Sequence, residues 1–512
     1  IFNVSKAYSA TIHGIDGLIV SVEADVSDGL PLFDMVGLLN SEVKEARERV
    51  RIALKNSGFM LPAKRITVNL SPADIRKEGT AFDLPVAIAI LTAFGHVPEE
   101  SLNDTLIIGE LSLNGNIKKV NGVLPFVYSA KQQGFTRCIV PKENAGEGAV
   151  VCGIKTYGAA TLKEAVELLK DFDAFEPETV NIKELFDRDF EDGNLDFSEV
   201  VGQHAVKRAI EVAVSGMHNI LMIGPPGSGK TMLAKRIPTV MPKLSFDESM
   251  EISKIYSIAG LLDNRAVITK RPFRAPHHTI TATALVGGGM IPRPGEISLA
   301  HLGVLYLDEF PEFQKNTIEV LRQPLEEKEV TISRLNATFR YPAGCMLVAS
   351  MNPCSCGYYP DRNKCNCSAV MVKRYLGKIS KPLLDRFDIC IETMNIDFKE
   401  LHTKKKEESS SDIRERISKA HQIQADRYKN YNIRYNSQLS PKTIKKFCHL
   451  EVKEQELLEK AFIKMNLSAR AYHRILKVAR TIADLDNSEK ITVMHLSEAI
   501  CYRSLDEKYW QA

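Results

Sequence analysis

The stretch Gly224-Pro-Pro-Gly-Ser-Gly-Lys-Thr231 lies between two segments of different character. Before it comes the apolar run Asn219-Ile-Leu-Met-Ile223, which predicts a buried strand, and after it comes Met232-Leu-Ala-Lys-Arg-Ile237, which opens a helix. Glycines allow the backbone N–H groups of such a loop to point at a phosphate, and the helix N-terminus adds a partial positive charge. The order strand, glycine-rich loop and helix therefore predicts a phosphate-binding loop in an α/β domain.

Two side chains of this loop are suited to nucleotide chemistry. Lys230 can reach the β- and γ-phosphate oxygens, and the Thr231 hydroxyl is a ligand for Mg²⁺. ATP and Mg²⁺ are thus the predicted cofactors, and a glycine-rich turn without a ligand is the alternative. The residues predicted to bind them are Gly224, Pro225, Pro226, Gly227, Ser228, Gly229, Lys230 and Thr231, together with Asp308.

A second apolar run, Gly303-Val-Leu-Tyr-Leu307, ends in two adjacent carboxylates, Asp308 and Glu309. Carboxylates at the end of a buried strand are costly unless a metal ion or a hydrogen-bond donor meets them. We expect Asp308 to hold Mg²⁺ together with Thr231, and Glu309 to polarise the water that attacks the γ-phosphate. An acidic turn without a chemical role is the alternative.

A third apolar run, Met346-Leu-Val-Ala-Ser350, is followed by Met351-Asn352-Pro353. An amide at the end of an interior strand is suited to aligning the attacking water near the γ-phosphate, which makes Asn352 a second catalytic candidate after Glu309. Asparagine also favours turns, so a purely structural Asn352 before the proline is the alternative.

The order of these three strands resembles that of AAA+ ATPases. Three further segments make the resemblance more specific, and they are Arg271-Pro-Phe-Arg-Ala-Pro-His-His278, Pro292-Arg-Pro-Gly-Glu-Ile-Ser-Leu-Ala-His301 and Leu321-Arg-Gln-Pro-Leu-Glu326. They are similar to the magnesium-chelatase-like branch known as the YifB/ComM family, and the similarity covers essentially the whole chain. The resemblance implies ATP hydrolysis by a ring of identical subunits, a homo-hexamer as in relatives.

The same resemblance assigns roles to individual arginines. Arg386, in Leu383-Leu-Asp-Arg-Phe-Asp388, corresponds to the arginine finger, which stabilises transition-state charge in a neighbouring subunit and supplies about 10³–10⁵ in rate. Arg470 corresponds to the sensor 2 residue on a helical lid, and Arg474, one turn further along the same helix, is the alternative. For these arginines the other interpretation is a charge on a solvated helix face.

The chain divides by pattern into an N-terminal α+β region, an acidic linker, an ATPase core and a helical lid. These regions are residues 1–170, 171–198, 199–397 and 398–512. In the first region, Leu18–Ala24 and Arg65–Leu70 predict strands and Ser41–Ser57 predicts a helix. The predicted fold class is therefore multidomain α/β, with a P-loop α/β/α core and an all-α lid.

The N-terminal region resembles the proteolytic domain of Lon-type proteases, which has a ribosomal-protein-S5-like fold. The resemblance runs through Ile108-Gly-Glu-Leu-Ser-Leu-Asn-Gly115 and Val140-Pro-Lys-Glu-Asn144. Active relatives need a serine nucleophile and a lysine that takes its proton. Here Ala81 stands where the serine would fall and Leu124 stands in place of the lysine, which implies a binding or assembly domain. Thr80 as a substitute nucleophile has no evident base.

Four of the ten cysteines are crowded into residues 354–367. They form the pattern C-x-C-x₈-C-x-C and are Cys354, Cys356, Cys365 and Cys367. Four thiolates in pairs are the ligand set of a structural, tetrahedral Zn²⁺ site, although the C-x-C spacing is tighter than the common C-x₂-C. The sequence predicts a structural zinc, and a reduced surface cluster or a labile disulfide pair are the alternatives.

The segment Glu327–Arg340 predicts two short strands around the turn Leu335-Asn-Ala337. Its place between the second and third core strands matches the pre-sensor-1 hairpin of related helicases, which points into the ring channel and touches DNA. Arg334 and Arg340 are therefore candidate phosphate contacts, and surface charges on a hairpin are the alternative. The insertion at 264–295 is a candidate second pore loop.

Two classes of function follow from the resemblance. The first is a DNA motor, a helicase or branch-migration factor of recombination or natural transformation, with single-stranded or branched DNA as its partner. The second is a chelatase-type ATPase that remodels a protein partner or drives metal insertion. The Lon-like region and the cysteine cluster favour the first, because the small chelatase ATPase subunit lacks them. A third, an unfoldase or protease, is disfavoured by the missing dyad.

The overall composition neither requires nor excludes a DNA partner, since the net charge is +3 and 44% of residues are apolar. No apolar stretch reaches the roughly 18–20 residues of a bilayer span. The first residues, Ile1–Lys6, lack the basic start and apolar core of a signal peptide. The remaining cysteines are scattered in apolar surroundings, which fits a reducing compartment. We therefore expect a cytoplasmic protein without a membrane partner.

Overall fold

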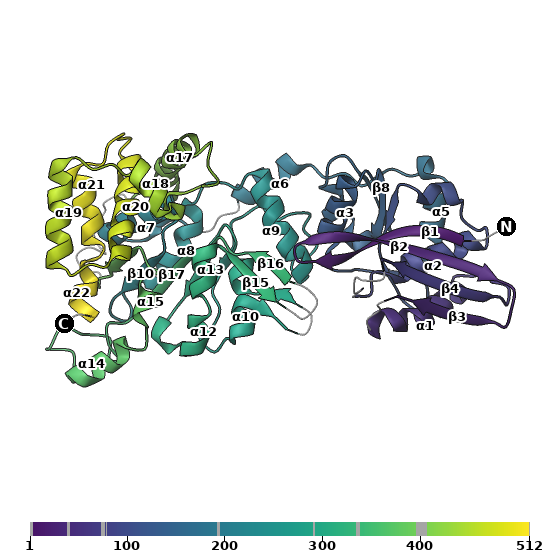
Figure 1. Cartoon of the computed structure of the whole chain (residues 1–512), viewed down its shortest axis with the longest axis horizontal. Coiled ribbons are helices and arrows are strands. Elements are labelled where there is room, and N and C mark those ends of the chain that lie inside the picture. The colour runs from purple at the N-terminus through teal and green to yellow at the C-terminus, as the bar shows by residue number, and fades with distance from the viewer. Residues whose placement is uncertain are drawn as a thin grey trace. The chain divides into compact units, whose positions relative to one another are not determined.

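The chain folds into two compact units, seen in a computed structural model (Figure 1). The structure describes residues 4–37, 41–72, 77, 79–191, 195–289, 292–333, 338–395 and 407–510. Unit 1 comprises Ile1–Arg188, Ser245–Thr269 and Ser333–Tyr341, and unit 2 comprises Asp189–Leu244, Lys270–Ile332 and Pro342–Ala512. Each unit is made of segments that are separated in the sequence but pack together. Residues 245–269 and 333–341 lie within the predicted core region 199–397, but they belong with the N-terminal residues.

A seven-stranded mixed sheet forms the frame of unit 1, in the order β3-β4-β2-β1-β5-β8-β9. Its strands are β1 (Val4–His13), β2 (Asp16–Ser27), β3 (Leu32–Val36), β4 (Arg65–Ser71), β5 (Thr105–Ile107), β8 (Arg137–Pro141) and β9 (Lys155–Ala159). β1 and β2 pair antiparallel from Val4↔Asp25 to His13↔Asp16, whereas β5, β8 and β9 extend the sheet in parallel. Alternate residues of β2 are buried, as expected for a sheet with one covered face.

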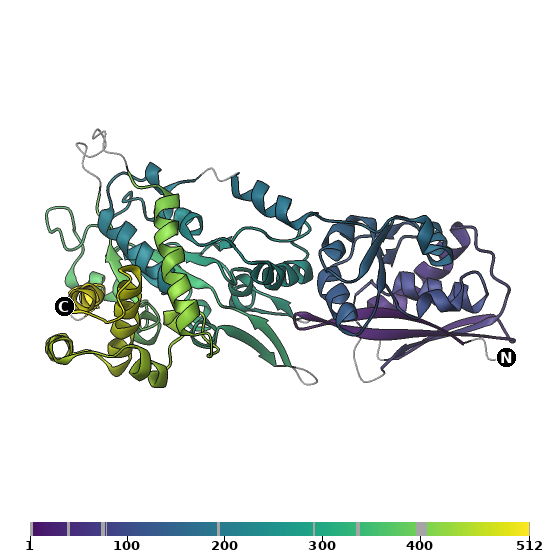
Figure 2. The same cartoon turned by 90° about the horizontal axis from the view of Figure 1, so that it is seen from above.

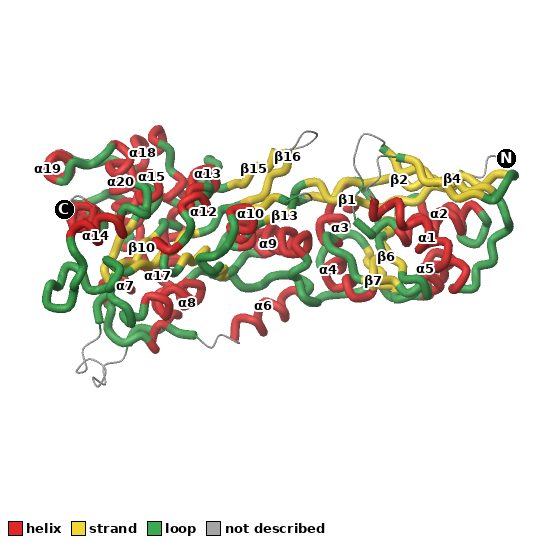
Figure 3. Tube along the Cα trace, turned by 90° about the horizontal axis from the view of Figure 1, so that it is seen from below, coloured by secondary structure: helices red, strands yellow, loops and turns green. Residues whose placement is uncertain are grey.

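The helices of unit 1 are α1 (Ser41–Asn56), α2 (Asp83–Ala93), α3 (Val123–Gln132), α4 (Ala145–Ala149), α5 (Leu162–Lys170) and α9 (Phe246–Ala259). Of these, α2 and α3 cover one side of strands β1 and β2 (Figure 3). Every residue of α2 is buried, because this helix is apolar on all sides. The helix predicted for Ser41–Ser57 and the strands predicted for Leu18–Ala24 and Arg65–Leu70 are confirmed as α1, β2 and β4.

Helix α9 belongs to unit 1 although the chain reaches it only after the phosphate-binding loop. Met250 of α9 lies in the same buried apolar cluster as residues of α3. Ser257 Oγ donates a 2.8 Å hydrogen bond to the buried carboxylate of Glu147, and Ser257 O accepts a 3.1 Å bond from Gly122 N. Burial raises the pKa of Glu147, and hydrogen bonds from Ser257 and Asn144 act in the opposite direction. The packing of α9 against the rest of unit 1 therefore depends on the hydrogen bonds that this buried carboxylate accepts.

Replacing Ser257 with Ala should loosen α9 from unit 1. The change removes a donor from a buried carboxylate, which costs about 1–3 kcal/mol. Amide hydrogen exchange in α9 and α3 should speed up about tenfold or more, because their opening free energy falls by that amount. Asp247→Asn, at an exposed position of the same helix, is the control and should leave exchange unchanged. Equal exchange in Ser257→Ala and the unmodified chain would contradict this account.

Unit 2 is built on a five-stranded sheet in the order β11-β14-β17-β10-β18. Its strands are β10 (Ile220–Ile223), β11 (Phe273–Arg274), β14 (Val304–Leu307), β17 (Met346–Met351) and β18 (Ile389–Glu392). All the pairs are parallel, and every residue of β10, β14 and β17 is buried. The registers Ile223↔Met351 and Leu307↔Ala349 bring the carboxyl ends of β10, β14 and β17 to one edge. The three predicted core strands are thus confirmed, and in the sheet they are immediate neighbours.

The lid and the ATPase core share one hydrophobic core in unit 2. Leu476 and Ile482 of α20 belong to the same buried cluster as Ile210 of α7. Figures 1 and 2 show α17, the long light-green helix, beside α7 and α20. The main helices of unit 2 are α7 (His204–Gly216), α8 (Lys230–Val240), α17 (Ser410–Arg427), α18 (Pro441–Phe447), α19 (Val452–Lys464), α20 (Ala469–Leu485), α21 (Val493–Cys501) and α22 (Ser504–Trp510).

Part of the acidic segment predicted as a linker is helical. Helix α6 (Ile182–Glu191) presents Ile182, Leu185 and Phe186 to an apolar cluster of unit 1. Their i, i+3, i+4 spacing forms an apolar stripe, which the surrounding aspartates and glutamates conceal in the sequence. The segment is therefore partly packed rather than a plain tether.

Short elements complete the fold. They are β6 (Glu110–Leu111), β7 (Ile117–Lys118), α10 (Ala282–Val286), β12 (Gly287–Gly288), β13 (Arg293–Pro294), α11 (Glu296–Leu299), α12 (Lys315–Glu319), α13 (Arg322–Glu327), β15 (Glu329–Ser333), β16 (Thr338–Pro342), α14 (Ala369–Leu376) and α15 (Lys381–Leu384). Within the described ranges, no helix has both the length and the apolar character needed to cross a membrane.

Candidate nucleotide site

The phosphate-binding loop connects β10 to α8, as the sequence predicts. Gly227 and Gly229 adopt left-handed backbone conformations, with φ of 80° and 82°. Such φ values favour glycine, and they allow the loop to turn its N–H groups inward. Lys230 is the first residue of α8, directly after its Gly229 N-cap. The loop therefore has the shape that phosphate binding requires.

Lys230 lies inside this loop rather than in solvent. Its Nζ donates to Gly224 O and Pro225 O at 2.8 Å each, and to Asn352 Oδ1 at 3.2 Å. Burial lowers the pKa of Lys230, and the nearby Asp308 carboxylate acts in the opposite direction. Lys230 and Asn352, which follow different strands in the sequence, thus meet at one point.

The two predicted Mg²⁺ ligands also meet. Thr231 Oγ1 donates a 2.8 Å hydrogen bond to Asp308 Oδ2. Ser350 donates to the other carboxylate oxygen, and Tyr306 OH lies 2.8 Å from Ser350 Oγ. Burial alone would raise the pKa of Asp308, but the hydrogen bonds from Ser350 and Thr231 outweigh it and lower the pKa. Asp308 is therefore held as a carboxylate, the form that binds Mg²⁺.

Glu309 is placed differently from its neighbour. Its backbone is left-handed, with φ of 51°, and its N–H donates to Asp308 Oδ1 at 2.9 Å. The side chain is 62% exposed, and its carboxylate lies 3.7 Å from His278 Nδ1. Non-glycine residues with positive φ cluster at functional sites, where the surrounding structure maintains the strain. Glu309 is thus turned away from the core and free to meet a water molecule.

Arg386 lies at the opposite edge of the same sheet. It precedes β18, and Ile389 of β18 pairs with Ile220 at the start of β10. The phosphate-binding loop follows the end of β10, so the parallel pairing separates Arg386 from that loop by the length of the strand, roughly 10–13 Å. The Arg386 side chain is 9% exposed and pairs with Glu326 at 2.5 Å. An arginine at this edge does not face the nucleotide loop of its own chain.

The two candidates for sensor 2 differ in their surroundings. Arg470, near the start of α20, is exposed and has no polar partner among the described residues. Arg474 is largely buried, donates to Phe387 O at 3.0 Å and lies 3.6 Å from the carboxylate of Asp388. Arg474 is therefore on the same edge of the sheet as Arg386.

The four cysteines come together as a single cluster. All four Sγ atoms lie within 4.8 Å of one another, and the Cys354–Cys356, Cys354–Cys365 and Cys356–Cys365 separations are 3.3, 3.8 and 3.6 Å. Tetrahedral Zn²⁺ with Zn–S bonds of about 2.3 Å requires sulfurs about 3.8 Å apart. The donor set and its spacing therefore fit a zinc ion.

The cysteine cluster lies against the phosphate-binding loop. Gly357, inside the cluster's turn, has a left-handed φ of 89°, and a Cβ there would stand 2.5 Å from Pro226 Cδ. Only glycine permits this close approach. Asn352 comes directly before the cluster in sequence, so the cluster borders the site through both Pro226 and Asn352.

The predicted hairpin is confirmed as β15 and β16, which pair with each other. Arg340 is exposed on β16, and the ring of its neighbour Phe339 lies beside that of His13 in a tilted arrangement, with ring centroids 5.4 Å apart. Arg334 and the turn at residues 335–337 lie outside the described residues. The hairpin thus exists, and one of its two candidate arginines is on its surface.

The positions of the missing protease dyad are filled by core residues. Ala81 and Leu124 belong to one buried apolar cluster. Thr80 does have a partner that the sequence does not suggest, because its hydroxyl donates to the carboxylate of Glu110. A carboxylate is a weak base for a hydroxyl, so this pair does not restore the serine–lysine chemistry.

Several residues of the site are not predicted from the sequence. Ser350 and Tyr306 orient Asp308 and Thr231, and a polar group within an otherwise apolar strand was the signal for both. His278 stands beside Glu309, and no local pattern links them because they lie on separate loops. Such partners become visible only when the fold is known.

Comparison with known proteins gives matches along most of the chain. The family profile described as "Magnesium chelatase, subunit ChlI" matches residues 196–401. Profiles described as "Subunit ChlI of Mg-chelatase" and "Magnesium chelatase, subunit ChlI C-terminal" match residues 22–144 and 407–503. Competence protein ComM of Haemophilus influenzae is 43% identical over 504 residues, 98% of each chain. Uncharacterized protein YifB of Escherichia coli is 41% identical over 511 residues, again 98% of each.

A more distant relative bears on the fold. Archaeal Lon protease of Methanocaldococcus jannaschii is 25% identical over 181 residues, which is 34% of this chain and 28% of the relative. Together with the profiles, this likeness confirms the predicted fold class, a Lon-like α+β N-terminal region, an AAA+ core and a helical C-terminal lid.

Proposed function

Since this chain belongs to the YifB/ComM family of magnesium-chelatase-like AAA+ ATPases, we propose that it is an ATP-hydrolysing ring motor that acts on DNA. The ring would be a homo-hexamer, and its task would be unwinding or branch migration of DNA during recombination or natural transformation. Its setting would be the cytoplasm, where thiols such as the cysteine cluster stay reduced.

The observation that carries the proposal is the division of the catalytic groups between two edges of one sheet. Lys230, Thr231, Asp308 and Asn352 converge at the carboxyl edge, with Glu309 beside them. Arg386 lies at the amino edge, and a finger there can complete a nucleotide site only in a neighbouring subunit. A ring in which every subunit offers both edges supplies this arrangement.

DNA is the proposed partner on two grounds. The relative with 43% identity carries the printed name of a competence protein, and competence is the uptake of DNA. The hairpin β15–β16 comes between the second and third core strands and exposes Arg340, whereas the second candidate, Arg334, lies outside the described residues. Arginines on such a hairpin are suited to bind the phosphates of a strand in the channel.

The proposal is tested by measuring ATP hydrolysis with and without single-stranded and forked DNA. We expect DNA to stimulate hydrolysis, and DNA binding to weaken steeply between low and high salt because phosphate contacts release counterions. Arg340→Ala should weaken binding and reduce the stimulation. Absence of both stimulation and binding at low salt would overturn the proposal.

A chelatase-type ATPase that remodels a protein partner is the second candidate, favoured by the description of the matching profiles. The same experiment separates the two. DNA stimulation supports the motor, whereas hydrolysis that is indifferent to DNA supports the chelatase-type role.

We also propose that Cys354, Cys356, Cys365 and Cys367 bind one structural Zn²⁺ per chain. Four thiolates at tetrahedral spacing form a closed ligand set, so the ion would stabilise the turn against Pro226 and have no open position for catalysis.

Cys354→Ser should abolish zinc binding and weaken ATP binding, because the turn next to Pro226 loses its anchor. Metal analysis of the purified protein and a fluorescent ATP analogue measure the two effects. Cys501→Ser, at an exposed cysteine outside the cluster, should retain the zinc. Purified protein without zinc, or equal zinc in both variants, would contradict the proposal.

A further inference from the structure

The loop that carries Arg386 is anchored through its backbone. Asn219 Nδ2 donates to Arg386 O at 2.9 Å, and Asn219 O accepts a 2.9 Å bond from Asp388 N. Arg474 of the lid helix α20 donates to Phe387 O at 3.0 Å. The loop is therefore fixed on one side by Asn219, which directly precedes strand β10, and on the other side by the lid.

Asp388 ties the same loop to the lid through its side chain. Its carboxylate lies 3.2 Å from His218 Nδ1 and 3.6 Å from Arg474 Nε. Burial alone would raise the pKa of Asp388, but the hydrogen bond and charge of His218, and the charges of Arg474 and Lys477, hold it well below the usual range. A buried carboxylate with these partners is strongly destabilised when a partner is lost.

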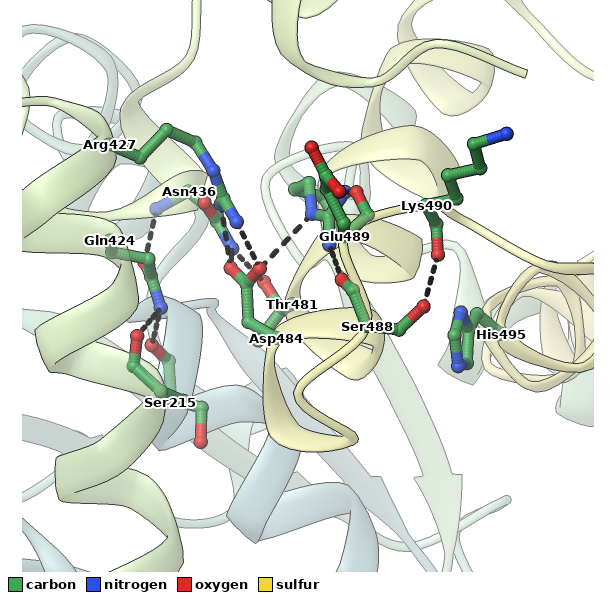
Figure 4. A network of polar contacts seen from close by, with 12 residues as sticks. Ser215, Gln424, Arg427, Asn436, Thr481, Asp484, Ser488, Glu489, Lys490 and His495 are labelled. Atoms are coloured by element: carbon green, nitrogen blue, oxygen red, sulfur yellow. Dashed lines mark hydrogen bonds and ion pairs between the residues drawn. The ribbon is translucent and has the colours of Figure 1, made fainter.

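From His218 a chain of polar contacts runs into the lid. His218 Nε2 lies 2.8 Å from Thr481 Oγ1, which accepts a 3.0 Å bond from Asn436. Asn436 also donates to Asp484 at 2.9 Å. Figure 4 shows Asn436 and Arg427 converging on Asp484, which is fully buried. The loop of Arg386 is thus one end of a buried network that joins the segment after α7 to α17 and α20.

The Arg386 guanidinium itself has few polar contacts that fix its position. Its ion pair with Glu326 involves a partner that is 60% exposed. Its Nε atom is buried and has no hydrogen-bond partner in the part of the chain that the structure describes. The direction of the side chain therefore depends mainly on the loop beneath it, and hence on Phe387 and Asp388.

We propose that Arg474 and His218 are positioning residues for Arg386. Through these two residues the lid of one subunit fixes the position of the arginine that the subunit presents to its neighbour. Arg474 holds Phe387 O and one carboxylate oxygen of Asp388, and His218 holds the other oxygen of Asp388. The inference rests on the proposed ring, in which Arg386 acts on a neighbour's nucleotide. It assigns Arg474 to the neighbour's reaction, in contrast to a sensor 2 role toward its own nucleotide.

Mixed rings made from two inactive parents separate these roles. Arg386→Ala subunits keep Glu309 but offer no arginine, so they are acceptors. Glu309→Gln subunits cannot hydrolyse their own ATP but still offer Arg386, so they are donors. Mixing the two should restore ATP hydrolysis at each interface where the Arg386 of a donor reaches the nucleotide of an acceptor. The restored rate of hydrolysis is the quantity measured.

Adding Arg474→Gln to the donor should lower the restored rate about 10- to 100-fold, because a small misplacement of a catalytic group has an effect of that size. The same change in the acceptor should leave the restored rate within about twofold, because the acceptor offers no arginine to position. His218→Gln in the donor should reproduce the donor-side loss, and so should the isosteric Asp388→Asn. Melting temperature and fluorescent-ATP binding of each variant check that folding is intact.

Each other outcome overturns the inference. A lower restored rate only when the acceptor carries Arg474→Gln would assign Arg474 to the nucleotide of its own subunit. Equal loss in both, or loss that follows the melting temperature, would reduce the network to a structural role. Loss with Arg474→Gln but not with His218→Gln or Asp388→Asn would mean that Arg474 itself touches the neighbour. If the Arg386→Ala and Glu309→Gln subunits without further changes fail to restore hydrolysis when mixed, the proposed ring itself is wrong. That result differs from every result that concerns Arg474.

Discussion

Changing Glu309 to Gln is expected to lower the rate of ATP hydrolysis by about 10²–10⁴-fold, the usual contribution of a positioned base. Glu309 is the exposed member of the carboxylate pair, and its left-handed backbone turns it away from the contacts that hold Asp308. An amide retains the shape of the side chain but cannot polarise water. ATP binding should persist, because Lys230, Thr231 and Asp308 are untouched.

Fluorescent-ATP binding and steady-state hydrolysis measure the two effects separately. Glu312→Gln is the matched control, since Glu312 is a nearby surface carboxylate paired with Lys378 at 2.9 Å. We expect the control to hydrolyse ATP within about twofold of the unmodified protein, because an exposed ion pair contributes little. Equal rates for Glu309→Gln and the control would remove Glu309 from the mechanism.

Changing Arg386 to Ala is expected to lower the rate by about 10³–10⁵-fold, the range for an arginine finger. The reason is geometric, because Arg386 stands at the amino edge of the sheet while the phosphate-binding loop stands at the carboxyl edge. ATP affinity of dilute, unassembled subunits should not change, since the arginine does not reach their own nucleotide.

The measurement is the hydrolysis rate as a function of subunit concentration. The unmodified protein should become more active per subunit as rings assemble, whereas Arg386→Ala should stay slow at every concentration. Arg374→Ala, at an exposed arginine of α14, is the control and should behave like the unmodified protein. A rate per subunit that does not depend on concentration, with full activity in Arg386→Ala, would contradict a site shared between subunits.

The core of the site could be predicted because its signals are local. A buried strand followed by glycines, by paired carboxylates or by an amide is visible in a few consecutive residues, and parallel pairing then places Lys230, Asp308 and Asn352 together. The cysteine cluster is local for the same reason. Arg386 required the family resemblance, because nothing in its immediate sequence distinguishes it from other arginines.

The rest depends on contacts between distant segments. The seating of α9 on unit 1 rests on Ser257 and Glu147, and neither residue has an unusual local pattern. The links from Arg474 to Phe387 and from His218 to Asp388 likewise join segments that are far apart in the chain. Acidic residues also masked the apolar stripe of α6. Periodicity reveals which side of an element is buried but not which element covers it.

The most direct test of the central claim, that this chain is an ATP-driven DNA motor, is strand displacement from a forked DNA duplex. We expect displacement with ATP and Mg²⁺, none with a non-hydrolysable analogue, and none with the Glu309→Gln protein even though that protein still binds the fork. Rapid ATP hydrolysis that DNA does not change, with no strand separation on forked DNA and no branch migration on four-way junctions, would contradict this claim.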